Sequence, residues 1–213
     1  MPAEETTVSA GVVLRRRGTW GWVTLVCFVL LAVRARGGLL PGDQRTAALL
    51  HLLPAPLLQA CAMIASTAGI AALGLLAVWR TRQDLRLLPL AVTMGLLLPL
   101  DAATKFLVHR LRPQGAGFGF PSGHAMVSMT AALLVSGAIW PALDGRRKAW
   151  ATVLVAALML AVAVGLVGRG RHWPSDVVGG WLLGAAYSGW TLPFIQTGGP
   201  RRAAGSLLRA SCE

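Results

Sequence analysis

The stretch AWATVLVAALMLAVAVGLVG, residues 149–168, contains no charged side chain and a single hydroxyl group. Its length matches the roughly 20 apolar residues that an α-helix needs to cross the hydrocarbon core of a bilayer. Basic residues stand directly before it, at 146–148, and directly after it, at Arg169. An uncharged helix flanked by cations is typical of a membrane-spanning segment.

Five further apolar runs accompany this one. Pro54 and Pro56 divide the second run into an interfacial piece and a span that starts near Pro56, and the third run continues as a more polar helix through Asp101, Lys105 and His109. Because backbone groups in lipid must be satisfied within the segment, and no period-2 alternation indicates a barrel, we expect an all-α integral-membrane bundle of six transmembrane helices. The six runs are residues 18–33, 47–79, 87–100, 125–143, 149–168 and 177–200.

The composition excludes most soluble classes of protein. The chain has 213 residues, of which 55% are hydrophobic and only 13% are charged, whereas a soluble domain is typically about 25% charged. Its 20 Lys and Arg against 8 Asp and Glu give a net charge of +12. These cations punctuate apolar runs and form no single patch, so we expect membrane lipids and no nucleic acid as partners.

The basic residues also predict an orientation. Six spans place both termini and the loops near 80–86 and 144–148 on one side, with twelve Lys and Arg against eight on the other. The positive-inside rule puts the side with twelve in the cytoplasm. As an alternative, the first run followed by Val33, Arg34 and Ala35 fits a cleaved signal peptide. Without cleavage, the chain comprises a cytoplasmic segment at 1–17, a membrane domain at 18–200 and a cytoplasmic tail at 201–213.

Two cations follow the third apolar run. Lys105 and Arg112 are seven residues apart, so on a helix that Pro113 ends they would share one face, about 10 Å apart along the axis. Such a pair suits an anion with several oxygens, although snorkelling of basic side chains at the interface explains it as well. Asp101, four residues before Lys105, is expected either to pair with it or to be a helix-end carboxylate in a wet pocket.

The tetrapeptide Pro121-Ser122-Gly123-His124 directly precedes the fourth run. Ser122 fits a helix N-cap, Gly123 lets backbone approach a ligand closely, and the helix N-terminus offers free N–H groups to an anion. His124 would then project from the first turn. The pattern therefore indicates either an anion site or an ordinary helix cap.

A second histidine and an acid stand before the last run. Asp176 follows His172 by four residues, with Pro174 near the first helical position. Asp176 could accept a hydrogen bond from one imidazole nitrogen and leave the other free to attack, although an ordinary His–Asp cap pair has the same spacing. Because such groups are costly near lipid, finding them at one depth with the cations points to function. The chemistry that they fit is phosphoryl transfer.

These residues resemble the motifs of the type 2 phosphatidic acid phosphatase superfamily, a group of integral-membrane lipid phosphatases. Lys105 through Arg112-Pro113 matches its Lys-x6-Arg-Pro motif, and residues 121–124 match its Pro-Ser-Gly-His motif. The resemblance extends from about Asp101 to Gly180 and to the pattern of apolar runs.

The third motif of that superfamily, Ser-Arg-x5-His-x3-Asp, is matched in part. His172-x3-Asp176 fits, but Leu166 stands where the superfamily has its phosphate-gripping arginine. We expect Arg169 to replace that arginine in preference to Arg171, because an arginine adjacent to His172 would have to fold back sharply.

The resemblance implies an enzyme of the cell membrane that hydrolyses a lipid phosphate or diphosphate without metal or cofactor, through a phosphohistidine, on the extracytoplasmic side. Phosphatidic acid is the favoured substrate. An undecaprenyl-diphosphate phosphatase and a catalytically impaired lipid-phosphate-binding relative are the alternatives. Arg110 is interpreted as a lipid-headgroup contact, and His51 and His109 as interfacial histidines. By the same resemblance the catalytic residues are His172, His124 and Asp176, and the phosphate-binding residues are Lys105, Arg112, Ser122, Gly123 and Arg169.

Overall fold

Helices make up most of the chain that the computed structural model describes, which is residues 3–64, 88–115, 117–140 and 143–196. Within those ranges the only β pairing is an isolated bridge between Leu111 and Phe118. The all-α prediction is therefore confirmed for this part of the chain. In chain order the helices are α1 (Ala3–Arg36), α2 (Asp43–His51), α3 (Ala55–Ile64), α5 (Leu88–Val108), α6 (Gly123–Ile139), α7 (Gly145–Gly168) and α8 (Pro174–Gln196).

Candidate membrane spans are found in three places among the described residues. The Thr19–Arg36 part of α1 and the whole of α7 are each long and apolar enough to cross a bilayer. Helices α2 and α3 are apolar enough only as a pair bent by 114°, which is either one broken span or a re-entrant loop. The break between them falls at Pro54, where the sequence predicts a division. The rest of that run, residues 65–79, lies outside the described residues, and the number of six spans stays a prediction.

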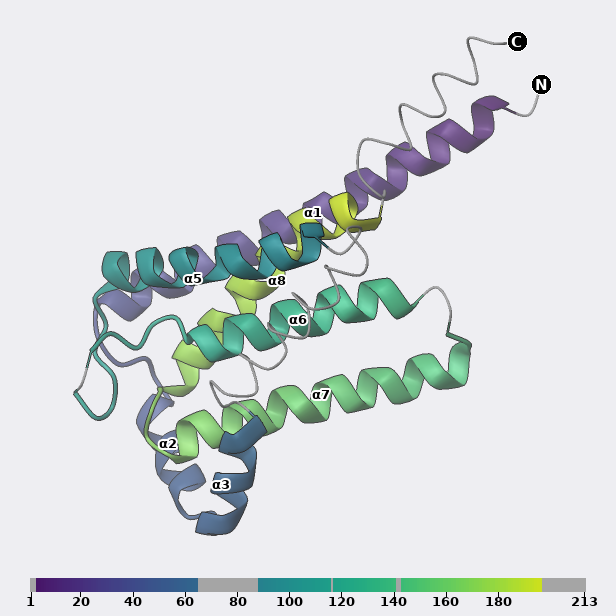
Figure 1. The fold of residues 1–213 in the computed structure, drawn as a ribbon. Helices are drawn as coiled ribbons and strands as arrows, with labels where there is room; N and C mark the ends of the chain where they lie inside the picture. The colour runs from purple at the N-terminus through teal and green to yellow at the C-terminus, as the bar shows by residue number, and fades with distance from the viewer. Residues whose placement is uncertain (1–2, 65–87, 116, 141–142, 197–213) are drawn as a thin grey trace.

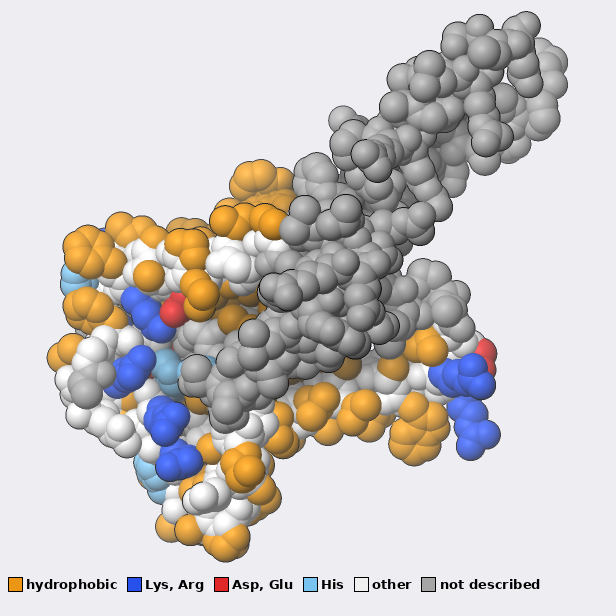
Figure 2. Space-filling view, viewed as in Figure 1, with side chains coloured by type: hydrophobic (Ala, Val, Ile, Leu, Met, Phe, Trp, Pro, Cys, Tyr) orange, Lys and Arg blue, Asp and Glu red, His pale blue; other side chains and the backbone are white. Residues whose placement is uncertain are grey.

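Large apolar side chains cover the outside of the helices (Figure 2). Leu30 of α1, Leu98 of α5 and Leu160 of α7 are 63%, 72% and 63% exposed. A soluble monomer rarely exposes extended apolar surface of this kind, whereas lipid would cover it favourably. The surface thus agrees with a membrane protein.

Helix α5 ends earlier than the sequence analysis expected. It stops at Val108, and His109 adopts a left-handed conformation with φ 57° while its N–H still reaches the Lys105 carbonyl at 3.0 Å. A left-handed residue cannot continue an α-helix, so the chain turns away at this point. Arg112 then lies in a loop, where its N–H donates to the Gly117 carbonyl at 3.2 Å. The prediction that Lys105 and Arg112 share one helix face is wrong.

Helix α8 packs between α1 and α6 (Figure 1). Its contact with α6 needs glycine at two positions. A Cβ at Gly180 would lie 2.4 Å from the carbonyl oxygen of Ser122, and one at Gly184 would lie 2.5 Å from that of Met126. Small residues at this four-residue spacing let helix backbones approach closely in membranes, and here they bring the starts of α6 and α8 together.

The α5–α6 connection and the α7–α8 connection lie at the same end of the bundle, together with the start of α2 (Figure 1). Helix α7 begins at the opposite end, where residues 146–148 supply basic side chains. The two loops that carry the motif residues are therefore neighbours in space.

Candidate active site

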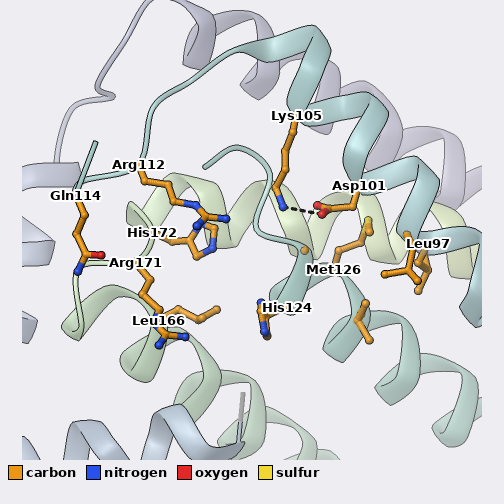
Figure 3. Close-up of a pocket in the computed structure, with 13 residues that line it drawn as sticks. Leu97, Asp101, Lys105, Arg112, Gln114, His124, Met126, Leu166, Arg171 and His172 are labelled. Atoms are coloured by element: carbon orange, nitrogen blue, oxygen red, sulfur yellow. Dashed lines mark hydrogen bonds and ion pairs between the residues drawn. The ribbon is translucent and has the colours of Figure 1, made fainter. Parts of the chain in front are cut away.

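A cavity of about 300 Å³ opens where α6 and α8 begin, and Figure 3 shows side chains from α5, α6, α7 and the connecting loops around it. Both polar and apolar side chains line this cavity. The polar lining consists of Asp101, Lys105, Arg112, Gln114, His124, Arg171 and His172. The other lining residues are Leu97, Leu98, Gly123, Met126, Val127 and Leu166.

Lys105 enters the cavity from α5 as half of an ion pair. Its Nζ lies 2.6 Å from Oδ2 of Asp101, and each side chain is 20% exposed. This confirms the pairing predicted from the four-residue spacing. Gly123 lies against the same carboxylate, because a Cβ there would be only 2.7 Å from Oδ2 of Asp101. The glycine thus makes room for the group that holds Lys105.

Arg112 reaches the cavity from the α5–α6 loop, and Figure 3 shows its guanidinium beside the ring of His172. The loop is closed by a hydrogen bond from the Gly119 N–H to the Arg110 carbonyl at 2.7 Å. Within the part of the chain that the structure describes, Nε of Arg112 is buried and has no hydrogen-bond partner. This N–H therefore has no acceptor among the described residues.

Ser122 caps α6, as the sequence predicts, with its Oγ accepting from the Ala125 N–H at 3.5 Å. The residue is fully buried, and its own N–H donates to the Asp176 carbonyl at 2.9 Å. Ser122 is not among the residues that line the cavity. The structure therefore places its hydroxyl behind the site, where it ties the start of α6 to the start of α8.

His124, the second residue of α6, lines the cavity and is half-buried. The charged or ionisable groups that act on it are His172, Lys105, Arg171 and Asp101. They come from α5 and from the segment before α8, so the imidazole lies where these two parts of the chain meet the start of α6. This position lets a proton pass between His124 and a bound group.

His172 stands just before α8, and Asp176 lies in the first turn of that helix. The His172 side chain is 5% exposed and that of Asp176 is fully buried, with 3.5 Å between Nδ1 and Oδ2. Among the described residues, Nδ1 makes no hydrogen bond, whereas Oδ2 accepts from the Trp173 N–H at 2.9 Å. The carboxylate thus faces Nδ1, and Nε2 is the nitrogen left for the cavity.

The turn after α7 decides which arginine enters the cavity. Gly170 adopts φ 67°, and the Arg171 N–H donates to the Leu166 carbonyl at 3.0 Å. Arg171 and Leu166 line the cavity, whereas Arg169 does not; the Arg169 carbonyl accepts from Nε2 of Gln114 at 3.1 Å. The tight turn at Gly170 folds Arg171 back, although such a turn next to His172 was expected to be too sharp.

Arg110 belongs to a buried network behind His172. The residue is 5% exposed, and its Nη1 donates to Oγ of Ser175 at 2.6 Å and to Oδ1 of Asp176 at 3.1 Å, while Nη2 pairs with Asp43. The interpretation of Arg110 as a lipid-headgroup contact is therefore wrong. A charge that is buried needs partners of opposite charge, and this arginine has two.

Asp43 and Ser175 are the members of this network that the sequence analysis missed. Asp43 opens α2 and accepts from the Leu40 N–H at 3.0 Å, the Ser175 N–H at 3.0 Å and the Ser175 hydroxyl at 2.7 Å. Its position before an apolar run gives it the appearance of an ordinary helix cap. Asp43 could have been predicted from the rule that a buried arginine needs acidic partners, because Asp176 was already assigned to His172.

Across residues 3–64, 88–115, 117–140 and 143–196, no group of three or more His, Cys, Asp and Glu side chains is placed to hold a metal ion. The cavity offers instead three cationic side chains, the amide end of a helix and two histidines. This set can bind a multiply charged oxyanion and exchange protons with it.

The fold is similar to that of a solved protein, the first transmembrane PAP2-type phosphatidylglycerolphosphate phosphatase from Bacillus subtilis. The TM-score is 0.67 at 18% sequence identity, and the match covers 83% of this chain and 96% of that one. At this identity the likeness shows the transmembrane fold.

Two curated relatives match about half of the chain or less. Phosphatidylglycerophosphatase B of Escherichia coli K12 is 37% identical over 95 residues, which is 43% of this chain and 32% of the relative. The undecaprenyl-diphosphatase of Sulfolobus acidocaldarius is 32% identical over 100 residues, which is 47% of this chain and 44% of the relative. The matched part is thus less than half the length of either relative. The family model described as PAP2 superfamily matches residues 86–199, which include every residue of the cavity lining. The chain belongs to the PAP2 superfamily.

Proposed function

We propose that this protein is an integral-membrane phosphatase that removes phosphate from a lipid phosphate or diphosphate through a phosphohistidine on His172. One observation carries the proposal: a single cavity is lined by His172 and Arg112 from two separate loops, by Lys105 from α5 and by His124 from α6. These residues occupy the matching positions of the superfamily motifs.

In the first step, Nε2 of His172 attacks the phosphorus atom. A P–N bond forms and the P–O bond to the lipid breaks, while His124 gives its proton to the departing oxygen. Asp176 faces Nδ1 at 3.5 Å and favours the tautomer with the proton on that nitrogen, so that the lone pair is on Nε2. The products are a phosphohistidine and a lipid alcohol, or a lipid monophosphate when the substrate is a diphosphate.

In the second step, His124 is neutral and takes a proton from a water molecule in the cavity. The water oxygen attacks phosphorus, the P–N bond breaks, and inorganic phosphate leaves. His172 recovers its lone pair and His124 its proton, so the enzyme returns to its starting state.

The phosphate oxygens would lie among three cations. Lys105 acts as a point charge held by Asp101, and Arg112 and Arg171 offer N–H forks. We assign to Arg171 the role of the superfamily arginine that Leu166 replaces, in place of Arg169. The backbone N–H groups at Gly123, where α6 begins, add a further positive end to the site.

The apolar half of the cavity favours a lipid over a water-soluble phosphate ester. Leu97 and Leu98 of α5 and Met126 and Val127 of α6 adjoin the cations, so a hydrocarbon tail can lie beside a phosphate without leaving apolar surroundings. Phosphatidic acid remains a proposed substrate. The names of the relatives add phosphatidylglycerophosphate and support undecaprenyl diphosphate.

The test is phosphate release by the purified protein in detergent with EDTA, using these three lipids in parallel. We expect hydrolysis of at least one of them, loss of activity in His172→Ala, and an acid-labile phosphoenzyme in the wild-type protein. The matched control is Arg147→Gln, which removes an exposed ion pair at the far end of the bundle. Activity of His172→Ala at the wild-type level would refute the mechanism. Lipid binding without turnover would favour the impaired, lipid-phosphate-binding alternative.

We also propose that the site faces the extracytoplasmic side and that both termini are cytoplasmic, because six spans place the termini on one side and the positive-inside rule puts that side in the cytoplasm. The position of residues 146–148 at the end of the bundle opposite the cavity supports this orientation. A fluorescent protein fused to the C-terminus should fold and emit only if that terminus is cytoplasmic. The orientation is contradicted if the fluorescent fusion is dark and a fusion of the same C-terminus to a reporter that is active only outside the cytoplasm is fully active.

A further inference from the structure

The network behind His172 joins parts of the chain that are far apart in the sequence. Arg110 and Asp176 are 66 residues apart, and Ser175 and Asp43 are 132 residues apart. Asp43 lies on α2, outside residues 86–199 that match the superfamily. The network therefore links the part of the chain that carries the motifs to a helix that does not.

Arg110 controls one of the two oxygens of the Asp176 carboxylate. Its Nη1 donates to Oδ1 at 3.1 Å, whereas Oδ2 accepts from the Trp173 N–H and faces Nδ1 of His172. With each oxygen held by a different group, the carboxylate cannot rotate without losing a charge-assisted hydrogen bond. The plane that it presents to His172 is thus set by Arg110 together with the Trp173 N–H.

Asp43 in turn holds Arg110. It pairs with Nη2, the end of the guanidinium that is directed away from Asp176, and three hydrogen bonds from Leu40 and Ser175 fix its own oxygens. Ser175 bridges the two, because its hydroxyl accepts from Nη1 of Arg110 and donates to Asp43. The guanidinium is thus held by Asp43 at Nη2 and by Asp176 at Nη1, which fixes its position between the two carboxylates.

Stability alone is a weak reason for this arrangement. Burying three charges costs desolvation energy that their attraction often fails to recover, and apolar replacements of similar volume are frequently as stable. Here the three side chains are at most 3% exposed, and Oδ2 of Asp176 lies 3.5 Å from Nδ1 of His172. A fixed carboxylate at this place has a use in catalysis that an apolar cluster would not have.

We propose that Arg110 is a positioning residue for the phosphatase reaction, which fixes the Asp176 carboxylate against Nδ1 of His172, and that Asp43 of α2 acts through Arg110. The inference rests on the proposed function of the site. It places the alignment of the nucleophile under the control of α2. Neither Arg110 nor Asp43 lines the catalytic cavity, so neither touches the substrate.

The experiment compares steady-state kinetics and melting temperatures of Arg110→Gln, Asp43→Asn and the double variant in detergent. We expect Arg110→Gln to lower kcat on the order of 10- to 100-fold, the range for groups that orient a catalytic ligand, with little change in KM. Phosphohistidine formation in a single turnover should slow by the same factor. Asp43→Asn should lower kcat less, and the double variant should be no slower than Arg110→Gln, because Asp43 acts only through Arg110.

Two further variants distinguish the positioning effect of Arg110 from the effect of its charge and from an effect on folding. Arg110→Lys keeps the charge but cannot reach Asp43, Ser175 and Asp176 together, so it should recover the melting temperature more than it recovers kcat. Arg147→Gln removes an arginine from an exposed Arg–Asp pair, with side chains 72% and 61% exposed, and should leave kcat unchanged.

The outcomes distinguish this inference from the proposed function. A wild-type protein that hydrolyses lipid phosphates while Arg110→Gln keeps its kcat, or loses only melting temperature, overturns the inference and leaves the function standing. If Arg110→Gln does not fold, Asp43→Asn decides, since it retains the Arg110–Asp176 pair: wild-type kcat in a folded Asp43→Asn protein overturns the role of Asp43 and of α2. A wild-type protein with no turnover on any of the lipids overturns both proposals.

Discussion

Replacing Gly123 with alanine tests how closely the start of α6 must approach the ion pair of α5. An added Cβ would lie 2.7 Å from Oδ2 and 2.9 Å from Oδ1 and Cγ of Asp101. Ordinary van der Waals contact begins near 3.4 Å, so the carboxylate has to retreat by about 3.4 − 2.7 = 0.7 Å. Its contact with Lys105, now 2.6 Å long, cannot be kept unless Lys105 moves as well.

The expected result is a loss of activity without a matching loss of stability. A misplacement of about 1 Å in a reacting constellation can cost on the order of 100-fold, so we expect kcat/KM of Gly123→Ala to fall about tenfold. The folded state should tolerate the change, because the carboxylate is the end of a side chain and alanine favours a helix over glycine by up to about 1 kcal/mol. Phosphate release and thermal melting in detergent measure the two effects.

Gly145→Ala is the matched control. Gly145 is also the first residue of a helix after a capping side chain, and a Cβ there meets nothing within 4 Å. The control should match the wild-type protein in activity. If Gly123→Ala is as active as Gly145→Ala, the close approach of Gly123 to Asp101 does not position Lys105 for catalysis.

Three further predictions concern Arg171, Gly180 and inhibition by vanadate. Arg171→Gln should raise KM on the order of tenfold, as the loss of a charge-assisted hydrogen bond implies, while Arg169→Gln should change KM by no more than about twofold. Steady-state kinetics of the two variants test this. Equal effects on KM would mean that Arg169 binds phosphate as well. Gly180→Val should lower the free energy of unfolding by about 1–3 kcal/mol through overpacking, because its Cβ would lie 2.4 Å from the Ser122 carbonyl oxygen. In the control Gly95→Ala the added Cβ meets nothing within 4 Å, so the free energy of unfolding should not fall. A Gly180→Val protein with the melting temperature of the wild type contradicts the close packing of α6 and α8. Vanadate should inhibit competitively in the presence of EDTA by imitating five-coordinate phosphorus, and a vanadate-insensitive activity would oppose attack by a histidine.

The features that the sequence predicts well depend on short spacings. The Asp101–Lys105 pair, the Ser122 cap and the start of α8 at Pro174 each follow from residues within one helical turn. Their physical causes are local, because capping and i,i+4 pairing need only the neighbouring turn. The proximity of His172 to Asp176 follows in the same way from a spacing of four.

Where the sequence analysis failed, the backbone took a left-handed conformation that no simple rule requires. His109, at φ 57°, ends α5 without a glycine or proline, so the helix was expected to continue to Arg112. Gly170, at φ 67°, makes the turn that brings Arg171 into the cavity. The first conformation moves Arg112 from a helix into a loop. The second places Arg171 rather than Arg169 at the cavity, and which of these two arginines binds phosphate stays a prediction.

Counting the acidic residues on the predicted extracytoplasmic side could have predicted the network of Arg110, Asp43 and Asp176, whereas residue spacing could not. On the predicted extracytoplasmic side the chain has three acids, Asp43, Asp101 and Asp176. Asp101 is assigned to Lys105 by its spacing and Asp176 to His172, which leaves Asp43 as the acid without a role. A buried cation needs a counter-charge in an apolar bundle, so any arginine of the motif loops that enters the protein must turn to Asp43 or share Asp176. Arg110 does both, and because of this it joins α2 to the nucleophile rather than to the lipid surface.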